Sequence, residues 1–282
     1  MIFRLFSVAY KRKGKFIRDC KRLLTIFKND GLIGVKQRIK YKLHHTNNQL
    51  DRQNYTEWIS RYDTLTDETR KKMYAQVDSF TCMPLISVIM PTYNSNLNYL
   101  TEAIESVRLQ LYPNWELCIA DDASTDKVIR SILERYSKQD PRIKVVFREQ
   151  NGNISKASNS ALELVSGEWV ALIDHDDILP EHALFWVANE IYQNPDIKLI
   201  YTDEDKIDEQ GRRYDAYFKS DWNPDLFLSH NMFSHFGVYR ADLIQRVAGF
   251  RVGFEGAQDY DLVLRCLEHV NYDQIRHIPR VL

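Results

Sequence analysis

From residue 84 onward, short apolar runs alternate with longer segments whose apolar residues recur every three or four positions. The short runs predict buried strands and the periodic segments predict helices. This alternation is typical of an α/β fold, a mostly parallel sheet flanked by helices. The predicted strands are Leu85–Met90, Trp115–Ala120, Ile143–Phe147, Trp169–Ile173 and Ile197–Tyr201. The predicted helices have an apolar face from Leu100 to Leu111, or lie near Lys127–Tyr136, Ser155–Val165 and Glu181–Tyr192.

The pattern is less regular on both sides of this region. Two short helices are predicted before it, at Tyr55–Tyr62 and Asp67–Val77, and Thr66 is in position to cap the second. After Tyr201 the alternation gives way to aromatic-rich segments. There the sequence predicts a strand near Phe236–Tyr239, a helix near Tyr260–Glu268 and a last strand at Gln274–Ile278.

The first 50 residues differ from the rest in charge. They hold 13 Lys or Arg against 2 Asp or Glu, although the net charge of the 282 residues is −1. Apolar residues from Ile2 to Phe27 recur at roughly helical spacing among these basic residues, which suits an anionic membrane surface. The same face could instead pack on the rest of the chain. Nucleic acid would accept the charge, but no recognition motif accompanies it, so no nucleic-acid partner is expected.

These patterns predict three regions. Residues 1–50 form a basic amphipathic helical extension, residues 51–83 a short helical connector, and residues 84–282 the α/β domain. The four cysteines have no close pair, which excludes a local Cys-x-x-Cys metal site and favours a reducing compartment. No apolar run approaches the roughly 18 residues that span a bilayer, and the start lacks the features of a secretion signal. We therefore expect a cytoplasmic protein, peripheral at the inner face of the cell membrane.

Three carboxylates follow the predicted strand Trp169–Ile173 directly. They belong to Asp174, Asp176 and Asp177. Clustered carboxylates repel one another unless a cation or a donor lies between them, and ligands of open α/β sheets bind at the carboxyl ends of the strands. The sequence thus indicates a site for a hard divalent cation, Mn²⁺ or Mg²⁺. A solvated loop that caps the helix near Pro180 is the alternative.

Two other strand ends are also polar, and parallel strands bring such ends to one edge of the sheet. Pro91-Thr92-Tyr93-Asn94 follows one strand, and Asp121-Asp122-Ala123-Ser124-Thr125-Asp126 follows another. Tyr93 could stack on a base, Asp122 could accept a hydrogen bond from one, and Asp174 could hold ribose hydroxyls. Because no Gly-x-Gly-x-x-Gly and no Gly-Lys-Ser/Thr is present, dinucleotide dehydrogenases and P-loop enzymes are disfavoured.

These motifs resemble the nucleotide-binding half of family 2 glycosyltransferases, which have the GT-A fold. The resemblance covers about residues 84–282, and it implies inverting transfer of a sugar from a nucleotide-sugar with Mg²⁺ or Mn²⁺. By motif match it assigns donor binding to Pro91, Tyr93, Asn94, Asp121, Asp122 and Asp174, with Asp121 in support. It makes Asp174 and Asp176 the Asp-x-Asp pair that holds the metal, and it assigns His175 between them no clear role.

Two further segments carry the resemblance. Asn151–Asn159 would open a helix near the phosphates, with Lys156 and Asn159 as donor-binding candidates, although plain helix capping explains them almost as well. Gly256-Ala257-Gln258-Asp259-Tyr260-Asp261 is the second. An inverting transfer needs a base that takes the proton of the acceptor hydroxyl. The family motif places that catalytic base at Asp259, and Asp261 is the weaker candidate.

The resemblance extends less clearly to the acceptor side. Tyr201–Lys206 and Phe218–Trp222 resemble acceptor loops of bacterial polysaccharide enzymes, or they are solvated loops. Family members usually continue past His277–Leu282 into a further His-containing segment that can complete the metal or diphosphate site, so a truncated C-terminus is expected. For His277 a core or edge-strand position is favoured over a related role in that site.

We therefore expect a glycosyltransferase of surface polysaccharide biosynthesis that acts on a glycan or lipid-linked glycan acceptor. A truncated, catalytically silent relative that binds a nucleotide-sugar or a partner enzyme is the alternative. A glycoside hydrolase with paired carboxylates fits less well, because the Asp residues cluster with nucleotide-type motifs.

Overall fold

The structure is a computed structural model that describes residues 54–282. The predictions for the basic extension therefore lie outside the described residues. Residues 54–62 form a helix, as predicted, in which Arg61 pairs with Glu57 four positions earlier. Residues 63–282 form one compact unit. Within the described residues, no helix is both long and apolar enough to cross a membrane.

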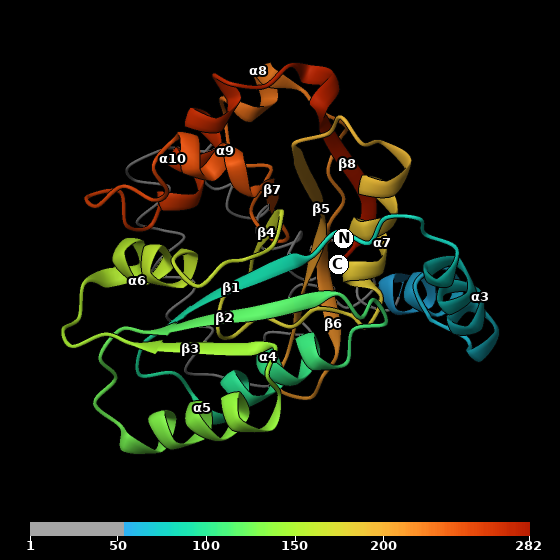
Figure 1. Ribbon diagram of the computed structural model, residues 1–282. Coiled ribbons are helices and arrows are strands. Elements are labelled where there is room, and N and C mark those ends of the chain that lie inside the picture. Colours follow the sequence, from blue (N-terminus) through green and yellow to red (C-terminus); the bar gives the residue numbers. More distant parts are fainter. Residues whose placement is uncertain (1–53) are drawn as a thin grey trace, which may run out of the picture. The chain divides into compact units, whose positions relative to one another are not determined.

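An eight-stranded mixed sheet forms the centre of this unit (Figure 1). Its strand order is β3-β2-β1-β4-β7-β5-β6, and β8 also pairs with β5. The strands are β1 (Ile86–Thr92), β2 (Trp115–Asp121), β3 (Ile143–Phe147), β4 (Trp169–Leu172), β5 (Leu199–Ile207), β6 (Arg213–Tyr217), β7 (Val238–Arg240) and β8 (Ile275–Val281). The first four are parallel to one another, β7 is antiparallel to β4 and β5, and β8 is parallel to β5.

Helices cover both faces of the sheet (Figure 1). On one face lie α3 (Asp67–Asp78), α4 (Leu97–Arg108), α5 (Lys127–Gln139) and α7 (Ala183–Gln193). On the other lie α6 (Asn153–Leu162), α9 (Ala241–Arg246) and α10 (Gln258–Leu267). The short helix α8 (Pro224–Phe227) and the 3₁₀ turn η1 (Tyr272–Gln274) complete the unit.

The pleat of the strands explains why two separate cores form. Successive side chains of a strand point to opposite faces. Val88 and Met90 therefore join the core beneath α4, α5 and α7, whereas Ile89 between them joins the core beneath α6 and α10. Because β1 is apolar on both faces, it must lie inside the sheet, and this agrees with its place between β2 and β4.

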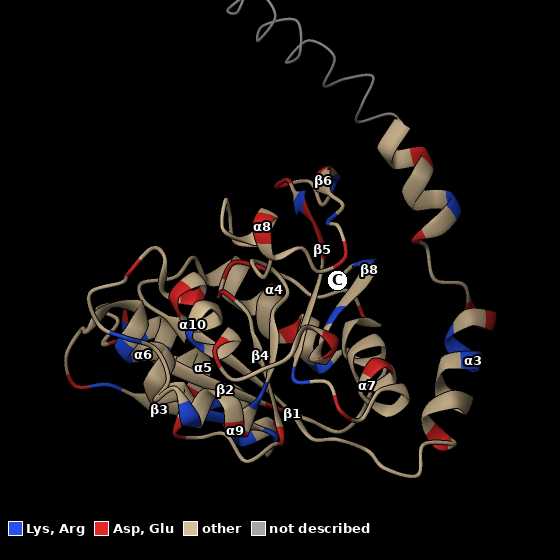
Figure 2. Cartoon of the chain, turned by 90° about the horizontal axis from the view of Figure 1, so that it is seen from above, with Lys and Arg blue, Asp and Glu red and all other residues tan. Residues whose placement is uncertain are grey.

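Acidic and basic side chains are interspersed along the surface helices (Figure 2). On α3, Lys72 pairs with Glu68 four positions earlier. The predicted cap of this helix is confirmed, because the Thr66 hydroxyl accepts a hydrogen bond from the Thr69 amide. Through Met73 and Val77, α3 contributes to the core of the compact unit.

The largest differences from the sequence prediction lie after residue 200. The segment Tyr201–Lys206, expected as an acceptor loop, is strand, because β5 continues to Ile207 and pairs with β6. Neither β6 nor the short helices α8 and α9 was predicted. Their local patterns are too short or too irregular to reveal them, and they are held by contacts distant in sequence.

Candidate active site

The polar ends of β1, β2 and β4 meet around a cavity of about 310 Å³. Register accounts for this, because Thr92 is opposite Asp121 in neighbouring strands and Ile89 is opposite Leu172. The cavity brings together five residues of the sequence prediction: Pro91, Tyr93, Asp122, Asp174 and Asp176.

Asp122 is almost fully buried at the base of this cavity, with 2% of its surface exposed. Its Oδ1 accepts from Arg148 Nε at 2.7 Å and from the Gly152 amide at 3.0 Å, and its Oδ2 accepts from the same amide at 2.9 Å. Oδ2 thus keeps capacity for a further donor. A Cβ at Gly152 would lie 2.8 Å from Arg148 Nη2 and 2.7 Å from Cδ of Lys156, so a larger residue there would displace these two side chains.

Two predicted residues shape the neighbouring loops and do not line the cavity. Asp121 accepts from the amide and the hydroxyl of Ser124. Asn94, at a φ of 47°, accepts at its Oδ1 from the Thr125 amide at 2.8 Å and from the Thr125 hydroxyl at 3.1 Å. Asp121 orders the loop after β2, and Asn94 joins that loop to the one after β1, so their effect on a ligand would be indirect.

The two candidates on α6 also lie outside the cavity lining. Lys156 is exposed. Asn159 uses both ends of its amide on the backbone of Phe250, donating to its carbonyl and accepting from its amide, each at 2.8 Å. A side chain so occupied holds the loop before α10 in place, and it is not free for a phosphate.

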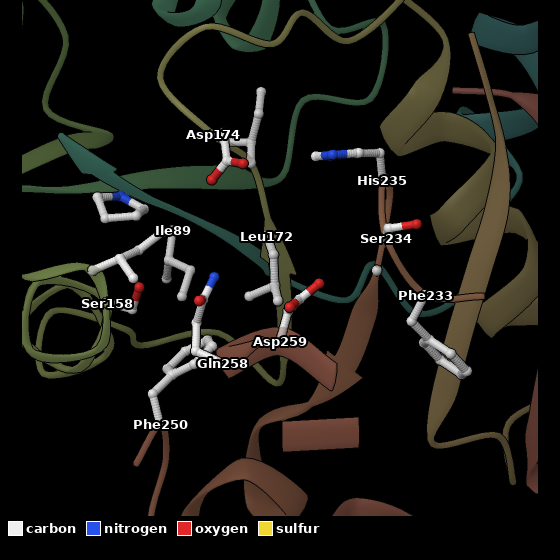
Figure 3. Close-up of a pocket in the computed structure, with 14 residues that line it drawn as sticks. Ile89, Ser158, Leu172, Asp174, Phe233, Ser234, His235, Phe250, Gln258 and Asp259 are labelled. Carbon is white, nitrogen blue, oxygen red and sulfur yellow. The ribbon is translucent and has the colours of Figure 1, made fainter. Parts of the chain in front are cut away.

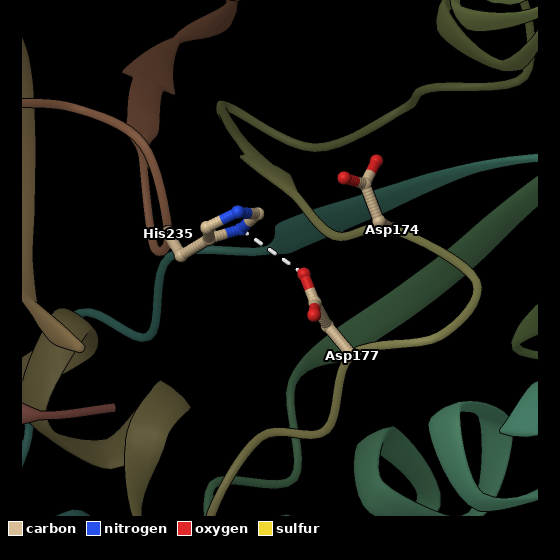
Figure 4. A group of neighbouring side chains, drawn as sticks. All are labelled: Asp174, Asp177 and His235. Carbon is tan, nitrogen blue, oxygen red and sulfur yellow. Dashed lines mark ion pairs between the residues drawn. The ribbon is translucent and has the colours of Figure 1, made fainter. Parts of the chain in front are cut away.

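Asp174 lies beside Asp177 and His235, and each of the three offers a ligand atom within 4.8 Å of the others (Figure 4). Burial, and then the Asp177 carboxylate, raise the pKa of Asp174. Asp177 Oδ2 lies 3.0 Å from Nδ1 of His235, and this carboxylate raises the pKa of His235 to about 9. A divalent cation here would relieve the repulsion between the carboxylates of Asp174 and Asp177, and it would bind His235 only in place of the imidazole proton. Asp176 lines the cavity but is not part of this group of three.

A second cavity, of about 60 Å³, adjoins the first (Figure 3). Pro91, Ile154 and Asp174 line both cavities. The far wall of the second contains Asp259, from the first turn of α10. The two strongest acidic candidates, Asp174 and Asp259, therefore face one small space.

Asp261 is excluded as a free base by its partners. Although burial opposes this, hydrogen bonds from Arg251 and Arg265 hold the pKa of Asp261 below its usual value. Arg265 also donates to the carbonyls of Val247 and Gly249. Asp261 thus anchors the loop before α10, whereas Asp259 faces the cavity.

The remaining candidates lie on the β5–β8 side. His277 of β8 bonds Asp203 at 2.9 Å, contacts Asp221 at 3.2 Å and stacks on Tyr201, so it has the core position that was favoured. Lys219, in the segment expected on the acceptor side, is buried. Its ammonium donates to the carbonyls of Ser234 and His235.

Sequence reasoning missed three residues that the structure brings to the site: Asn231, Phe233 and His235. They lie in an irregular segment before β7. These polar and aromatic residues belong to no motif that the sequence reveals. The path of the folded chain brings them opposite Asp174 and Asp259.

The mixed sheet flanked by helices, with carboxylates at the ends of its parallel strands, matches the GT-A fold of glycosyltransferases, to which the TarS glycosyltransferase compared below also belongs. The family model described as "Glycosyl transferase family 2" matches residues 87–248. The chain belongs to this family.

Curated relatives and solved structures agree with this assignment. The chain is 57% identical over 199 residues to the uncharacterized protein y4gI of Sinorhizobium fredii, covering 71% of this chain and 22% of that protein. It is 38% identical over 199 residues to the O-antigen biosynthesis protein RfbC of Myxococcus xanthus, covering 71% of this chain and 16% of RfbC. The chain therefore spans about a fifth of the length of these relatives. Among solved structures, S. aureus TarS in complex with UDP-GlcNAc matches with a TM-score of 0.57 and 26% identity, over 69% of this chain and 56% of that one.

Proposed function

We propose that this chain transfers a sugar from a nucleoside-diphosphate sugar to a hydroxyl group of a glycan, with inversion, in the synthesis of a bacterial surface polysaccharide. The observation that carries the proposal is the pair of adjoining cavities with Asp174 on their common wall. One contains the nucleotide-type residues Tyr93 and Asp122, and the other contains a carboxylate suited to act as a base. The complexes of TarS with UDP and UDP-GlcNAc support a nucleotide-sugar donor of the uridine class.

In this proposal the donor nucleotide occupies the larger cavity. Tyr93, with 44% of its surface exposed, offers a face on which a base can stack. Asp122, oriented by Arg148, accepts from the base through its remaining lone pair. The diphosphate then lies toward Asp174 and Asp176, which would hold Mn²⁺ or Mg²⁺. When bound, the metal would supply neutralisation of the charge that develops on the leaving diphosphate.

The acceptor hydroxyl occupies the smaller cavity, and Asp259 removes its proton as the oxygen attacks the anomeric carbon. Inversion requires that the base and the leaving group lie on opposite sides of that carbon. Asp259 and Asp174 come from different walls of the smaller cavity (Figure 3), which supports this arrangement.

The class of acceptor and the location in the cell are part of the proposal. Relatives named for O-antigen biosynthesis and chondroitin synthesis support a polysaccharide product. The excess of Lys and Arg in residues 1–50 supports a lipid-linked acceptor at the inner face of the membrane. Liposome flotation with and without these residues tests that part, and equal partitioning would refute it.

The transfer itself is tested with radiolabelled donors. Thermal shift with UDP-, dTDP- and GDP-sugars and Mn²⁺ first identifies the donor, since a ligand of the folded state raises the melting temperature. Transfer of the labelled sugar to an acceptor, or its hydrolysis to water, is then compared in the wild type, Asp259→Asn and Asp242→Asn. Asp242 is a matched control, because it is also a first-turn carboxylate but lies on α9 outside both cavities. Loss of transfer in Asp259→Asn alone is expected, and full activity there would refute the mechanism.

A further inference from the structure

The irregular segment between α8 and β7 reaches the carboxylate assigned as the base. Nδ2 of Asn231 donates a hydrogen bond to Oδ2 of Asp259 at 2.7 Å, across 28 positions of sequence. We propose that Asn231 is a positioning residue that orients the carboxylate of Asp259 for removal of the acceptor proton. This inference rests on the proposed function, in which Asp259 is the base.

The orientation of the Asn231 amide is determined by its other partner. Its Oδ1 accepts from the backbone amide of Phe233 at 2.9 Å. Because an N–H group can only donate, the oxygen must face Phe233 and the NH₂ group must face Asp259. A flipped amide would place its oxygen against the carboxylate and lose both bonds. Asn231 thus presents a donor, in a fixed direction, to one oxygen of Asp259.

The segment that carries Asn231 is itself firmly anchored. The side chain of Lys219 is fully buried, and its ammonium donates to the carbonyls of Ser234 and His235 while pairing with Glu204 at 2.7 Å. The amide of Phe236 donates to the Thr202 hydroxyl at 3.2 Å. Asn231 is therefore fixed to the β5 side of the sheet, whereas Asp259 belongs to α10, and the bond between them sets where the base lies relative to the sheet.

One carboxylate oxygen is thereby occupied and the other is available. Among the described residues, the bond from Asn231 is the one protein hydrogen bond to the side chain of Asp259. Oδ1 remains for the acceptor hydroxyl. With one oxygen fixed, the carboxylate loses rotational freedom before the acceptor arrives, which is the condition for an efficient base.

The test compares Asn231→Ala, Asn231→Asp and Asn231→Ser with Asn223→Ala in the full chain. Asn223 is a matched control, because its side chain caps α8 and lines neither cavity. The probe is the UDP-sugar that gives the largest thermal shift with Mn²⁺, with release of labelled sugar to water as the readout. For Asn231→Ala we expect kcat to fall ~10–100-fold, within the contribution of a general base, with KM for the donor within about twofold.

The other two variants show whether the hydrogen-bond donor is what matters. Asn231→Asp replaces the donor with a second carboxylate, which repels that of Asp259, and it should lower kcat at least as far as Asn231→Ala. Asn231→Ser keeps a donor and should restore part of kcat.

The outcomes distinguish a failure of the proposed function from a failure of the role of Asn231. If Asp259→Asn retains transfer, the proposed function fails. If Asp259→Asn is inactive while Asn231→Ala keeps the wild-type kcat, the proposed function stands and the role of Asn231 is refuted. Equal losses of kcat in Asn231→Ala and Asn223→Ala, with no recovery in Asn231→Ser, would also refute it, since they would show general destabilisation.

Discussion

Asp177 Oδ2 and His235 Nδ1 lie 3.0 Å apart and join the loop after β4 to the irregular segment before β7. The pKa of His235 is raised from 6.5 to about 9. A raised pKa means that the folded state binds the proton more tightly, so this stabilisation is complete below pH 6.5 and disappears as the pH rises through about 9.

His235→Gln should therefore lower the free energy of unfolding in acid and not in alkali. Because the imidazole is half exposed, the loss at pH 6 should be at most ~1 kcal/mol. Urea unfolding in EDTA at pH 6 and pH 10, for wild type and variant, measures it. A loss of the same size at both pH values would contradict the ion pair as its cause.

Single substitutions in the loop Asp174–Asp177 distinguish which of its carboxylates hold the metal. Asp174→Asn and Asp176→Asn should each weaken binding of Mn²⁺ in the presence of UDP by about tenfold or more, since each removes one anionic ligand. Asp177→Asn should have a smaller effect, because that carboxylate is engaged with His235. Titration calorimetry with Mn²⁺ gives the order. A larger loss for Asp177→Asn than for Asp176→Asn would instead assign the metal to Asp174, Asp177 and His235.

Arg148 should matter for the donor although it does not line the cavity. Its guanidinium pairs with Asp122 and also donates to Ser160 and the Lys156 carbonyl. Arg148→Met would leave a buried carboxylate without its cation, at a cost of roughly 3 kcal/mol in stability, and the donor would bind about tenfold more weakly. Chemical unfolding and UDP titration measure the two effects. Arg130→Met removes an exposed ion pair with Glu134 and a cation–π contact with Phe147, leaves Asp122 paired, and should change donor binding little.

The buried side chain of Glu116, far from the polar strand ends, should make the free energy of unfolding depend on pH in the opposite direction. Burial would raise its pKa, but Lys144, Ser87 and Ser166 lower it to about 2 from 4.5. A lowered pKa gives stability that is present above pH 4.5 and lost as the pH falls through about 2. Glu116→Gln should cost roughly 2–3 kcal/mol at pH 7, and less below pH 3. Denaturant unfolding at both pH values tests this, with exposed Glu134→Gln as the control. An equal loss of stability at both pH values would show that the packing of the Glu116 side chain, and not its charge, contributes the stability.

The sequence predicted best what depends on neighbouring residues. The apolar runs around Ile89 and Ile119 are strands, as predicted. A buried strand can be recognised from its own residues, without knowledge of its neighbours in the sheet. Carboxylates at strand ends were also predictable, since parallel strands place Asp122 and Asp174 at one edge. The roles of Asn159 and Asn231 were not. Both are amides whose partners, Phe250 and Asp259, are determined by the tertiary fold. An Asn side chain can hold a loop, as Asn159 does, or contact a carboxylate, as Asn231 does, and its residue type alone does not distinguish the two roles.

The wall that the two cavities share has a thermodynamic consequence. Pro91, Ile154 and Asp174 contact whatever fills either space, so the free energy of occupying one depends on the contents of the other. Such coupling is reciprocal: if UDP and Mn²⁺ tighten binding of the acceptor by some factor, the acceptor must tighten binding of UDP by the same factor. With coupling of that sign, a nucleotide left behind after transfer would also tighten binding of a glycan that still fills the smaller cavity.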